Sequence, residues 1–109
     1  MNWYIAKLVF QIVTGADRPG AQFDEHLRLS QAASYEQAFR KAKLLGIQEE
    51  DSVLTAGQEG ATWAFVNITE LYPLKDLADG AELYSQIHET PEGKSYIRGV
   101  HRRAAELNA

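Results

Sequence analysis

One carboxylate in this sequence stands where an acid or a base could act. Residues 22–32 alternate between apolar and polar side chains, as a strand with one buried face does, and Glu25 falls on the apolar side between Phe23 and Leu27. Carboxylates are seldom buried without a partner, and those with perturbed pKa values cluster at functional sites. Glu25 is therefore the first candidate site residue.

Two interpretations of Glu25 stay open. In the first, it works in a cleft between the sheet and a loop, together with Tyr84 or His26, as in a small enzyme or ligand-binding domain. In the second, it forms an ion pair with Lys7 or Arg28 and its role is structural. A solvent-open cleft that holds Glu25 favours the first interpretation, and pairing with either base favours the second.

The histidines do not form a metal site in the predicted fold. His26 and His88 are expected on the outer faces of two edge strands, which lie about 14 Å apart in a four-stranded sheet. His101 lies on the apolar stripe of a closing helix, and no ligand spacing such as H-x-x-x-H occurs. No phosphate-binding or nucleophile motif appears either. The sequence therefore predicts no catalytic residue, no metal and no other cofactor.

Aromatic side chains are a second kind of candidate, because the predicted strands carry many of them. Trp3, Trp63 and Tyr84 could form a ligand platform or anchor an interface. Aromatic residues also favour strands on their own account, so packing within the core and the sheet is the alternative interpretation.

The composition limits the class of protein. The 109 residues suit one domain, and 45% hydrophobic with 24% charged residues is the usage of a globular chain rather than a disordered one. No apolar run approaches the roughly 20 residues that span a bilayer, and the first residues lack the pattern of a secretory signal. Cysteine is absent, which excludes a disulfide scaffold and a thiol nucleophile. We therefore expect a cytoplasmic protein that does not enter membranes.

Charge is unevenly distributed along the chain. Residues 1–89 carry seven bases and thirteen acids, a net charge of −6, whereas residues 90–109 carry four bases and two acids, a net charge of +2. An acidic body repels phosphate backbones, so nucleic-acid binding is disfavoured. The basic end is expected to be a solvated helix face, or a strip that meets an acidic surface of this chain or of a neighbour.

The hydrophobic periodicity predicts four strands and two helices in the order β-β-α-β-β-α. The strands are predicted over residues 3–13, 22–32, 61–72 and 81–89. The first and third are apolar on both faces, which is typical of central strands, and the other two are half polar, as edge strands are. We therefore expect an α+β fold with a four-stranded antiparallel sheet in strand order 2-1-3-4.

The helix between the second and third strands is expected to begin at Ser34, which forms a capping box with Gln37, and to end at Gly46. It can cover only one face of the sheet. The other face must be covered by the closing helix of residues 90–109 or by a second copy of the chain. Residues 47–60 show no pattern clear enough to assign. The whole chain is expected to form a single domain, with the closing helix at its periphery.

Four segments resemble a known family. They are residues 3–10 (WYIAKLVF), 22–29 (QFDEHLRL), 63–66 (WAFV) and 79–85 (DGAELYS). Together they look like the signature segments of a small bacterial family known only as domain of unknown function 4288. The resemblance covers about residues 3–89 and leaves the closing helix outside. Because that family is uncharacterised, the resemblance implies a bacterial origin but no catalytic residues.

We therefore expect a non-enzymatic binding or protein-interaction module, whose partner is a second copy of itself or another protein. The doubly apolar strands and the lack of a catalytic constellation motivate this prediction. The alternative is a small ligand-binding domain or enzyme that uses Glu25 in a cleft. The candidate ligand or interface residues are Glu25, His26, Tyr84, Trp3 and Trp63.

Overall fold

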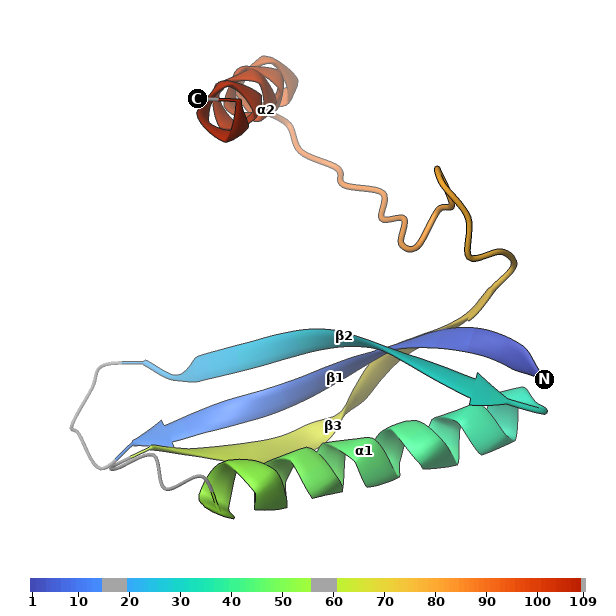
Figure 1. The fold of residues 1–109 in the computed structure, drawn as a ribbon. Helices are drawn as coiled ribbons and strands as arrows, with labels where there is room; N and C mark the ends of the chain where they lie inside the picture. The colour runs from blue at the N-terminus through green and yellow to red at the C-terminus, as the bar shows by residue number, and fades with distance from the viewer. Residues whose placement is uncertain (15–19, 56–60, 109) are drawn as a thin grey trace.

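The structure is a computed structural model that describes residues 1–14, 20–55 and 61–108, and the side chains of these residues except for 51–55. Three strands and two helices follow one another along the chain (Figure 1). They are β1 (Asn2–Thr14), β2 (Gln22–Ala32), α1 (Tyr35–Thr55), β3 (Ala61–Leu74) and α2 (Gly93–Leu107). The α+β class predicted from the sequence is confirmed.

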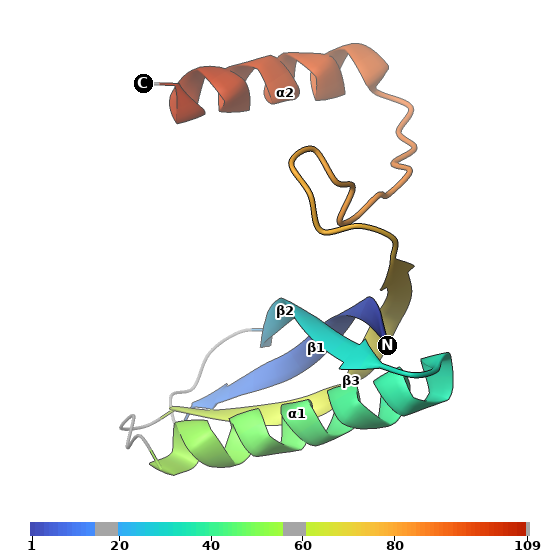
Figure 2. The same cartoon turned by 45° about the vertical axis from the view of Figure 1, so that its right-hand side comes forward.

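The sheet has three antiparallel strands in the order β2-β1-β3. The predicted four-stranded sheet with order 2-1-3-4 is therefore wrong. β1 is central, as its two apolar faces indicated, but β3 is an edge strand. α1 connects the two strands that flank β1, so it crosses β1 on one side of the sheet (Figures 1 and 2).

Residues 81–89, predicted as the fourth strand, form no strand in the part of the chain that the structure describes. They belong to an extended linker, residues 75–92, that rises from the end of β3. Its two predicted inward residues face water instead of a core, since Leu83 is 51% and Ile87 is 89% exposed. Alternation of apolar and polar residues shows only that a segment can be extended. A strand also needs a neighbour for its backbone hydrogen bonds, and residues 81–89 pair with no strand among the described residues.

The pairing of β3 with β1 is interrupted twice, and at each interruption β3 has one extra residue. Its register against β1 shifts between Lys7 and Leu8 and again between Val9 and Phe10, which marks irregularities of the bulge type. After these shifts Phe65 lies opposite Phe10 and Ile68 opposite Leu8, and both pack against the core. Strict alternation would place Phe65 and Ile68 on opposite faces, because it does not allow for an extra residue in a strand.

The core lies between one face of the sheet and α1. Leu8 and Phe10 of β1 have no exposed surface, and Ala42 of α1 packs against them at 1% exposure. Burying a side chain of this size stabilises the fold by about 1.5–3 kcal/mol. The small residues Ala38 and Ala42 let α1 approach the sheet closely, so the helix and the sheet bury their apolar side chains in one common layer.

α1 begins as the sequence predicts but ends later. The Ser34 hydroxyl accepts a hydrogen bond from the Gln37 backbone N–H at 3.1 Å, and the Gln37 side chain accepts one from the Ala33 N–H. The prediction that Gly46 ends the helix is wrong, because α1 continues to Thr55. A Cβ at Gly46 would lie 2.3 Å from the Phe65 ring, so this glycine makes room for a neighbour rather than for a turn.

Among the described residues no helix covers the opposite face of the sheet, which we call the open face. It includes the residues that alternate with the core positions: Trp3, Ile5, Lys7, Val9, Gln11 and Val13 of β1, Phe23, Glu25, Leu27 and Leu29 of β2, and Glu70 and Tyr72 of β3. Phe23, Leu27 and Leu29 are 55%, 51% and 48% exposed. The sequence placed these three residues toward a core, and the structure leaves them half in water.

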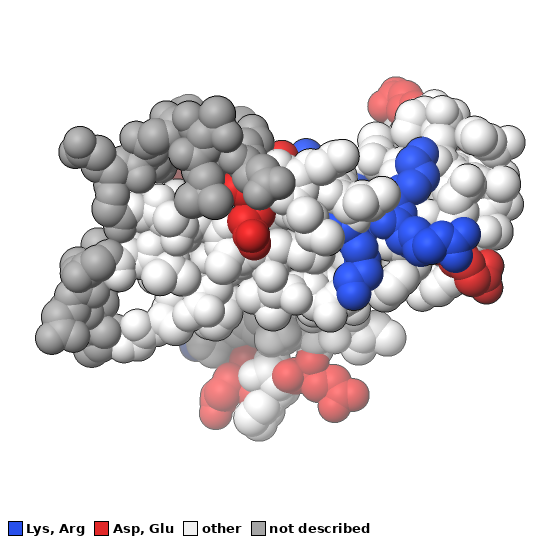
Figure 3. Space-filling view, turned by 90° about the horizontal axis from the view of Figure 1, so that it is seen from below, with Lys and Arg blue, Asp and Glu red and all other residues white. Residues whose placement is uncertain are grey.

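α2 lies apart from the sheet, on the side opposite α1 (Figures 1 and 2). Among the described residues it contacts no other helix or strand, and none of its residues is buried. The outer surface of α1 is also solvated. Basic side chains gather there (Figure 3), and Arg40 and Lys41 are exposed. The molecule therefore has one buried layer, one free sheet face and one free helix.

Candidate functional site

An ion-pair cluster lies at the centre of the open face. The Lys7 Nζ lies 2.8 Å from Oε1 of Glu25 on β2 and 3.3 Å from Oε2 of Glu70 on β3. The three residues come together because β1 lies between the two edge strands and Lys7 is opposite Glu70 in the register. One lysine therefore bridges all three strands.

Two tyrosines extend this cluster. The Tyr72 hydroxyl donates a hydrogen bond to Glu70 Oε1, and the Tyr84 ring from the linker lies with its centroid 5.7 Å from Lys7 Nζ. The Tyr72 and Tyr84 rings meet edge to face at 6.0 Å. Tyr84 is thus the residue that places the linker over the sheet, and Ile5 beside it is 4% exposed.

The electrostatics of the cluster hold Lys7, Glu70 and Tyr72 in their ordinary charge states. The hydrogen bond to Glu25, and then that to Glu70, raises the pKa of Lys7 above its usual value. The hydrogen bond from Tyr72, followed by that from Lys7, lowers the pKa of Glu70. The same Glu70 carboxylate raises the pKa of Tyr72 to about 12. All three pKa values are therefore shifted further from pH 7.

This has a direct consequence for chemistry. A general acid or base works best when its pKa lies near the working pH. Lys7 stays protonated, Glu70 stays ionised and Tyr72 stays neutral at pH 7, so these groups do not exchange protons there. The cluster can instead present fixed charge and hydrogen-bonding groups to a surface that lies on the sheet.

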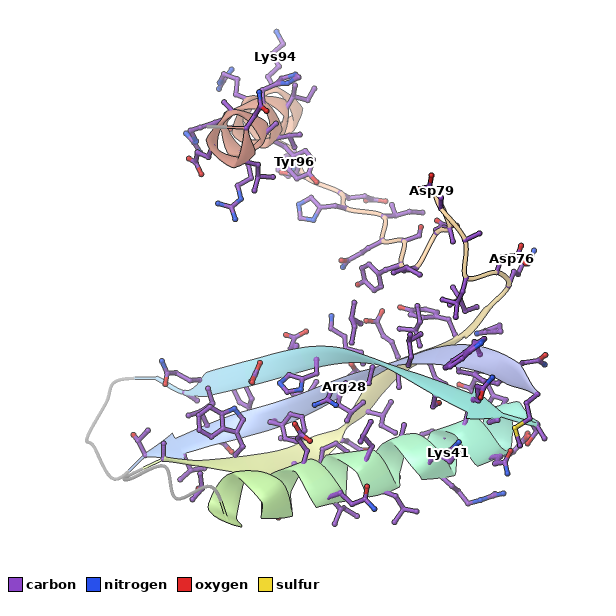
Figure 4. All side chains as sticks on the ribbon, viewed as in Figure 1. Arg28, Lys41, Asp76, Asp79, Lys94 and Tyr96 are labelled. Atoms are coloured by element: carbon purple, nitrogen blue, oxygen red, sulfur yellow. The ribbon has the colours of Figure 1, made fainter. Side chains whose placement is uncertain are left out.

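A second polar group lies on the α1 side of β2. The Asp24 carboxylate contacts His26 Nε2 at 2.8 Å and accepts a hydrogen bond from Trp63 Nε1 at 3.0 Å. Arg28 points from β2 toward α1 (Figure 4), where its Nη2 donates to Glu49 Oε1 at 2.7 Å. This chain of contacts ties β2 to both β3 and α1.

The hydrogen-bond network fixes the roles of the two ring nitrogens of His26. Nε2 faces an acceptor, Asp24, and Nδ1 lies 3.4 Å from a donor, the Arg28 Nη2. The neutral ring with its proton on Nε2 satisfies both neighbours. The bond from His26, and then that from Trp63, lowers the pKa of Asp24. This group is a structural tie between elements, with the His26 ring packed at 4.9 Å from that of Phe10.

Glu25 and His26 lie on opposite faces of the sheet. Glu25 shares a face with Phe23 and Leu27 as expected, and of the two bases suggested for it, Lys7 is its partner. His26 was expected on the outer side of the strand and lies on the α1 side instead. Adjacent strand residues point in opposite directions, so Glu25 and His26 do not share a site, while Glu25 and Tyr84 both meet Lys7.

The other candidates are dispersed. Trp3 is partly buried near the start of β1, opposite Gln31 and Leu74, and Trp63 serves the Asp24 group. The His88 ring stacks on Tyr96 at 4.9 Å, far along the chain from His26. Of the five predicted site residues, Trp3, Glu25 and Tyr84 therefore lie on the open face or contact it, and His26 and Trp63 lie on the α1 side.

Sequence reasoning missed Glu70, Asp24 and Glu49 as members of these groups. A signal was present for the first cluster, because Lys7 is the only charged residue in the thirteen of β1 and needs a partner on each side. The bonds of Asp24 and Glu49 carried no such signal. They depend on which side of β2 meets α1, and that choice is made by packing.

Neither cluster forms a metal site. Within the described ranges, no group of three or more histidine, aspartate or glutamate side chains could hold an ion. A shallow cavity of about 160 Å³ lies between the end of β3 and residues 82–85, lined by Tyr72 and Tyr84 among others but not by Glu25. The helices that the structure describes include none with the length and apolar character needed to cross a membrane.

The comparisons with known proteins identify the family alone. No curated protein and no solved structure matches the chain. A family described as a domain of unknown function, DUF4288, matches residues 3–85, which include all of the sheet except Asn2, all of α1, and the linker as far as Ser85. The match leaves α2 outside and assigns no role to either cluster. This chain belongs to the DUF4288 family.

Proposed function

We propose that this chain is a non-enzymatic protein-interaction module that acts as a homodimer, and that the open face is its contact surface. The observation that carries the proposal is the row of half-exposed apolar side chains on β2. Phe23, Leu27 and Leu29 lie along β2 at one edge of the sheet, with Glu25 between the first two, on the face that no helix among the described residues covers. Contiguous apolar surface rimmed by polar groups is typical of protein contact sites.

The ion-pair cluster supports this proposal. Lys7 and Glu70 lie beside the apolar row and Glu25 lies within it, and Lys7 stays protonated and Glu70 ionised at pH 7. Charged groups next to an apolar contact select partners and orient them more than they add affinity. For its location we propose the cytoplasm, since a chain without cysteine suits a reducing compartment.

Sedimentation velocity over a range of protein concentrations tests the proposal. We expect the wild-type chain to sediment as a dimer, and Leu27→Glu to sediment as a monomer, because the variant places a charge in the apolar row. The matched control is Leu44→Glu. Leu44 is 57% exposed on α1 and does not belong to the open face, so this variant should dimerise like the wild type.

The outcomes separate clearly. A wild-type chain that stays monomeric at the highest concentration overturns the proposal. Equal loss of dimer in both variants also contradicts it, because the contact would then not be specific to the open face. Circular dichroism of each variant verifies that the body is folded.

A further inference from the structure

The closing helix α2 is amphipathic, yet among the described residues it packs against no other helix or strand, and its Tyr96 ring stacks on His88 of the linker. One side of it carries an apolar stripe, formed by Tyr96, Ile97, Val100, Ala104 and Leu107. Isolated helices of about this length are marginal in water, and the two glycines of α2 weaken it by about 1 kcal/mol each. The helix therefore needs a partner surface in order to be stable.

We propose that the apolar stripe of α2 docks on the open face of a second copy, and that the second copy docks its α2 in return. This inference rests on the proposed function, because it names the element that occupies the dimer contact. A reciprocal exchange gives a closed two-fold dimer in which each chain both supplies a helix and receives one.

The two surfaces match in length and in charge. From Tyr96 to Leu107 the stripe is about 16 Å long, and from Phe23 to Leu29 the apolar row is about 20 Å long. Residues 90–109 carry a net charge of +2 and residues 1–89 one of −6. The open face holds two glutamates, Glu25 and Glu70, that share one lysine, Lys7. The Arg103 side chain at the edge of the stripe is 72% exposed and contacts Glu106 of the same helix at 3.2 Å.

The orientation of α2 turns its apolar stripe and its charged side in different directions. Tyr96 lies on the side of the helix that faces the sheet, and Lys94 lies on the side that faces away (Figure 4). Between helix and sheet runs the linker, which contacts the open face through Tyr84 and then leaves it. In the single chain α2 does not reach that face, so a helix from another molecule is the occupant that we infer.

The exposed area of the chain agrees with such an exchange. The accessible surface is 8427 Å², about 2,400 Å² more than expected for a compact chain of this mass. The radius of gyration is 17.6 Å, against about 13 Å for a compact domain of this length. If half of the excess is covered in each chain, the dimer contact totals about 2,400 Å², within the range of permanent dimers.

Complementation between two variants of the full chain tests the exchange. Leu27→Glu damages the receiving face and leaves the helix intact, whereas Val100→Glu damages the helix and leaves the face intact. Each variant alone should be monomeric where the wild type is a dimer, with a dissociation constant raised at least about 100-fold. An equal mixture of the two should contain a heterodimer, because one undamaged contact remains in each pair.

The control for the helix is Ala105→Glu, which adds the same charge on the side of α2 away from the stripe and should dimerise normally. Val100→Glu does not disturb folding of the body, since α2 makes no contact with it. Sedimentation velocity with one variant labelled at its amino terminus reports the mixed pair.

Each result has one meaning. A wild-type monomer, including one with α2 folded onto its own face, overturns both the exchange and the proposed dimer. If the wild type is a dimer and Val100→Glu is one as well, the exchange fails and dimerisation through the open face still stands. If both variants are monomeric and their mixture is too, the exchange is likewise wrong.

Discussion

The two faces of the three-stranded sheet are made by alternate residues of the same strands, and they differ in what covers them. On one face Leu8 and Phe10 are fully buried beneath α1. On the other, Leu27 and Leu29 have about half of their surface in water. The difference does not come from the apolar content of the strands, since both faces carry leucine and phenylalanine.

The polar groups of the two faces differ in the same way. The Asp24 group on the α1 side joins β2 to β3, and Arg28 next to it joins β2 to α1 through Glu49. The Lys7 group on the open face joins the three strands and the linker residue Tyr84. The first group therefore connects the sheet to the helix that covers it, whereas the second connects the strands and the linker on the other face. Substitutions on one face at a time test this difference between the two faces.

The largest effect is expected from Leu8→Ala on the covered face. Leu8 has no exposed surface and packs in the layer between β1 and α1. Removing its side chain leaves a cavity that the rigid sheet cannot close, so the free energy of unfolding should fall by about 2–5 kcal/mol. Urea denaturation followed by tryptophan fluorescence measures it. A loss below 1 kcal/mol would show that this face is not the core.

A smaller loss is expected from Gly46→Ala. In an exposed helix this substitution stabilises by about 1 kcal/mol. Here the new methyl group would lie 2.3 Å from the Phe65 ring, so we expect destabilisation by about 1–3 kcal/mol instead. The control is Gly99→Ala in α2, where nothing lies within 4 Å of an added Cβ. That variant should gain helix content, and a gain in stability at Gly46 would contradict the close packing of α1.

These two residues also show what sequence can predict. The central place of β1 and the start of α1 at Ser34 both follow from local patterns, because apolar alternation and a capping side chain act over a few residues. The role of Gly46 does not, since a glycine in a helix is typical of its end. The reason becomes visible only in the structure, where the Phe65 ring of β3 lies against Gly46 and leaves no room for a side chain.

Two expectations failed because each inferred the surroundings of a segment from its own residue pattern. The prediction for residues 81–89 assumed that an alternating segment finds a sheet edge, and the prediction for His26 assumed that polar strand residues face solvent. On β2 the polar side meets α1 and the apolar side faces outward, which inverts the usual rule. The apolar–polar alternation of β2 does not show which of its two sides faces α1. The inversion makes sense if the apolar side is covered by something outside the chain.

An intermediate effect is expected from Asp24→Asn on the α1 side. The variant loses the charged acceptor for His26 and Trp63, and the free energy of unfolding at pH 7 should fall by about 1–2 kcal/mol. Because the folded pKa of Asp24 is lowered below its ordinary value of 3.8, its stabilisation is present above that pH and is lost as the pH falls through the folded value.

Denaturation at pH 7 and at pH 3 measures this dependence. The difference between wild type and Asp24→Asn should be large at the first pH and shrink at the second. Asp76→Asn in the linker is the control, because Asp76 is exposed and projects away from the sheet (Figure 4). A difference that stays constant with pH would mean that the contact does not depend on the charge of Asp24.

The smallest effect on the single chain is expected from Leu27→Ala, the same chemical change as Leu8→Ala on the other face. At high dilution the unfolding free energy should change by no more than about 0.5 kcal/mol, since the side chain is 51% exposed. Raising the protein concentration should separate the two variants. Association stabilises the folded wild type by mass action, and Leu27→Ala should lose part of that gain while Leu8→Ala keeps it.

Thermal melts at two concentrations a hundredfold apart measure this difference. Leu8→Ala should lower the melting temperature of the chain by the same amount at both, because its loss lies inside one molecule. Leu27→Ala should lower it only at the higher concentration, because its loss lies between molecules. If Leu27→Ala costs as much as Leu8→Ala at high dilution, the open face is part of the core of a single chain, and the distinction between the two faces fails.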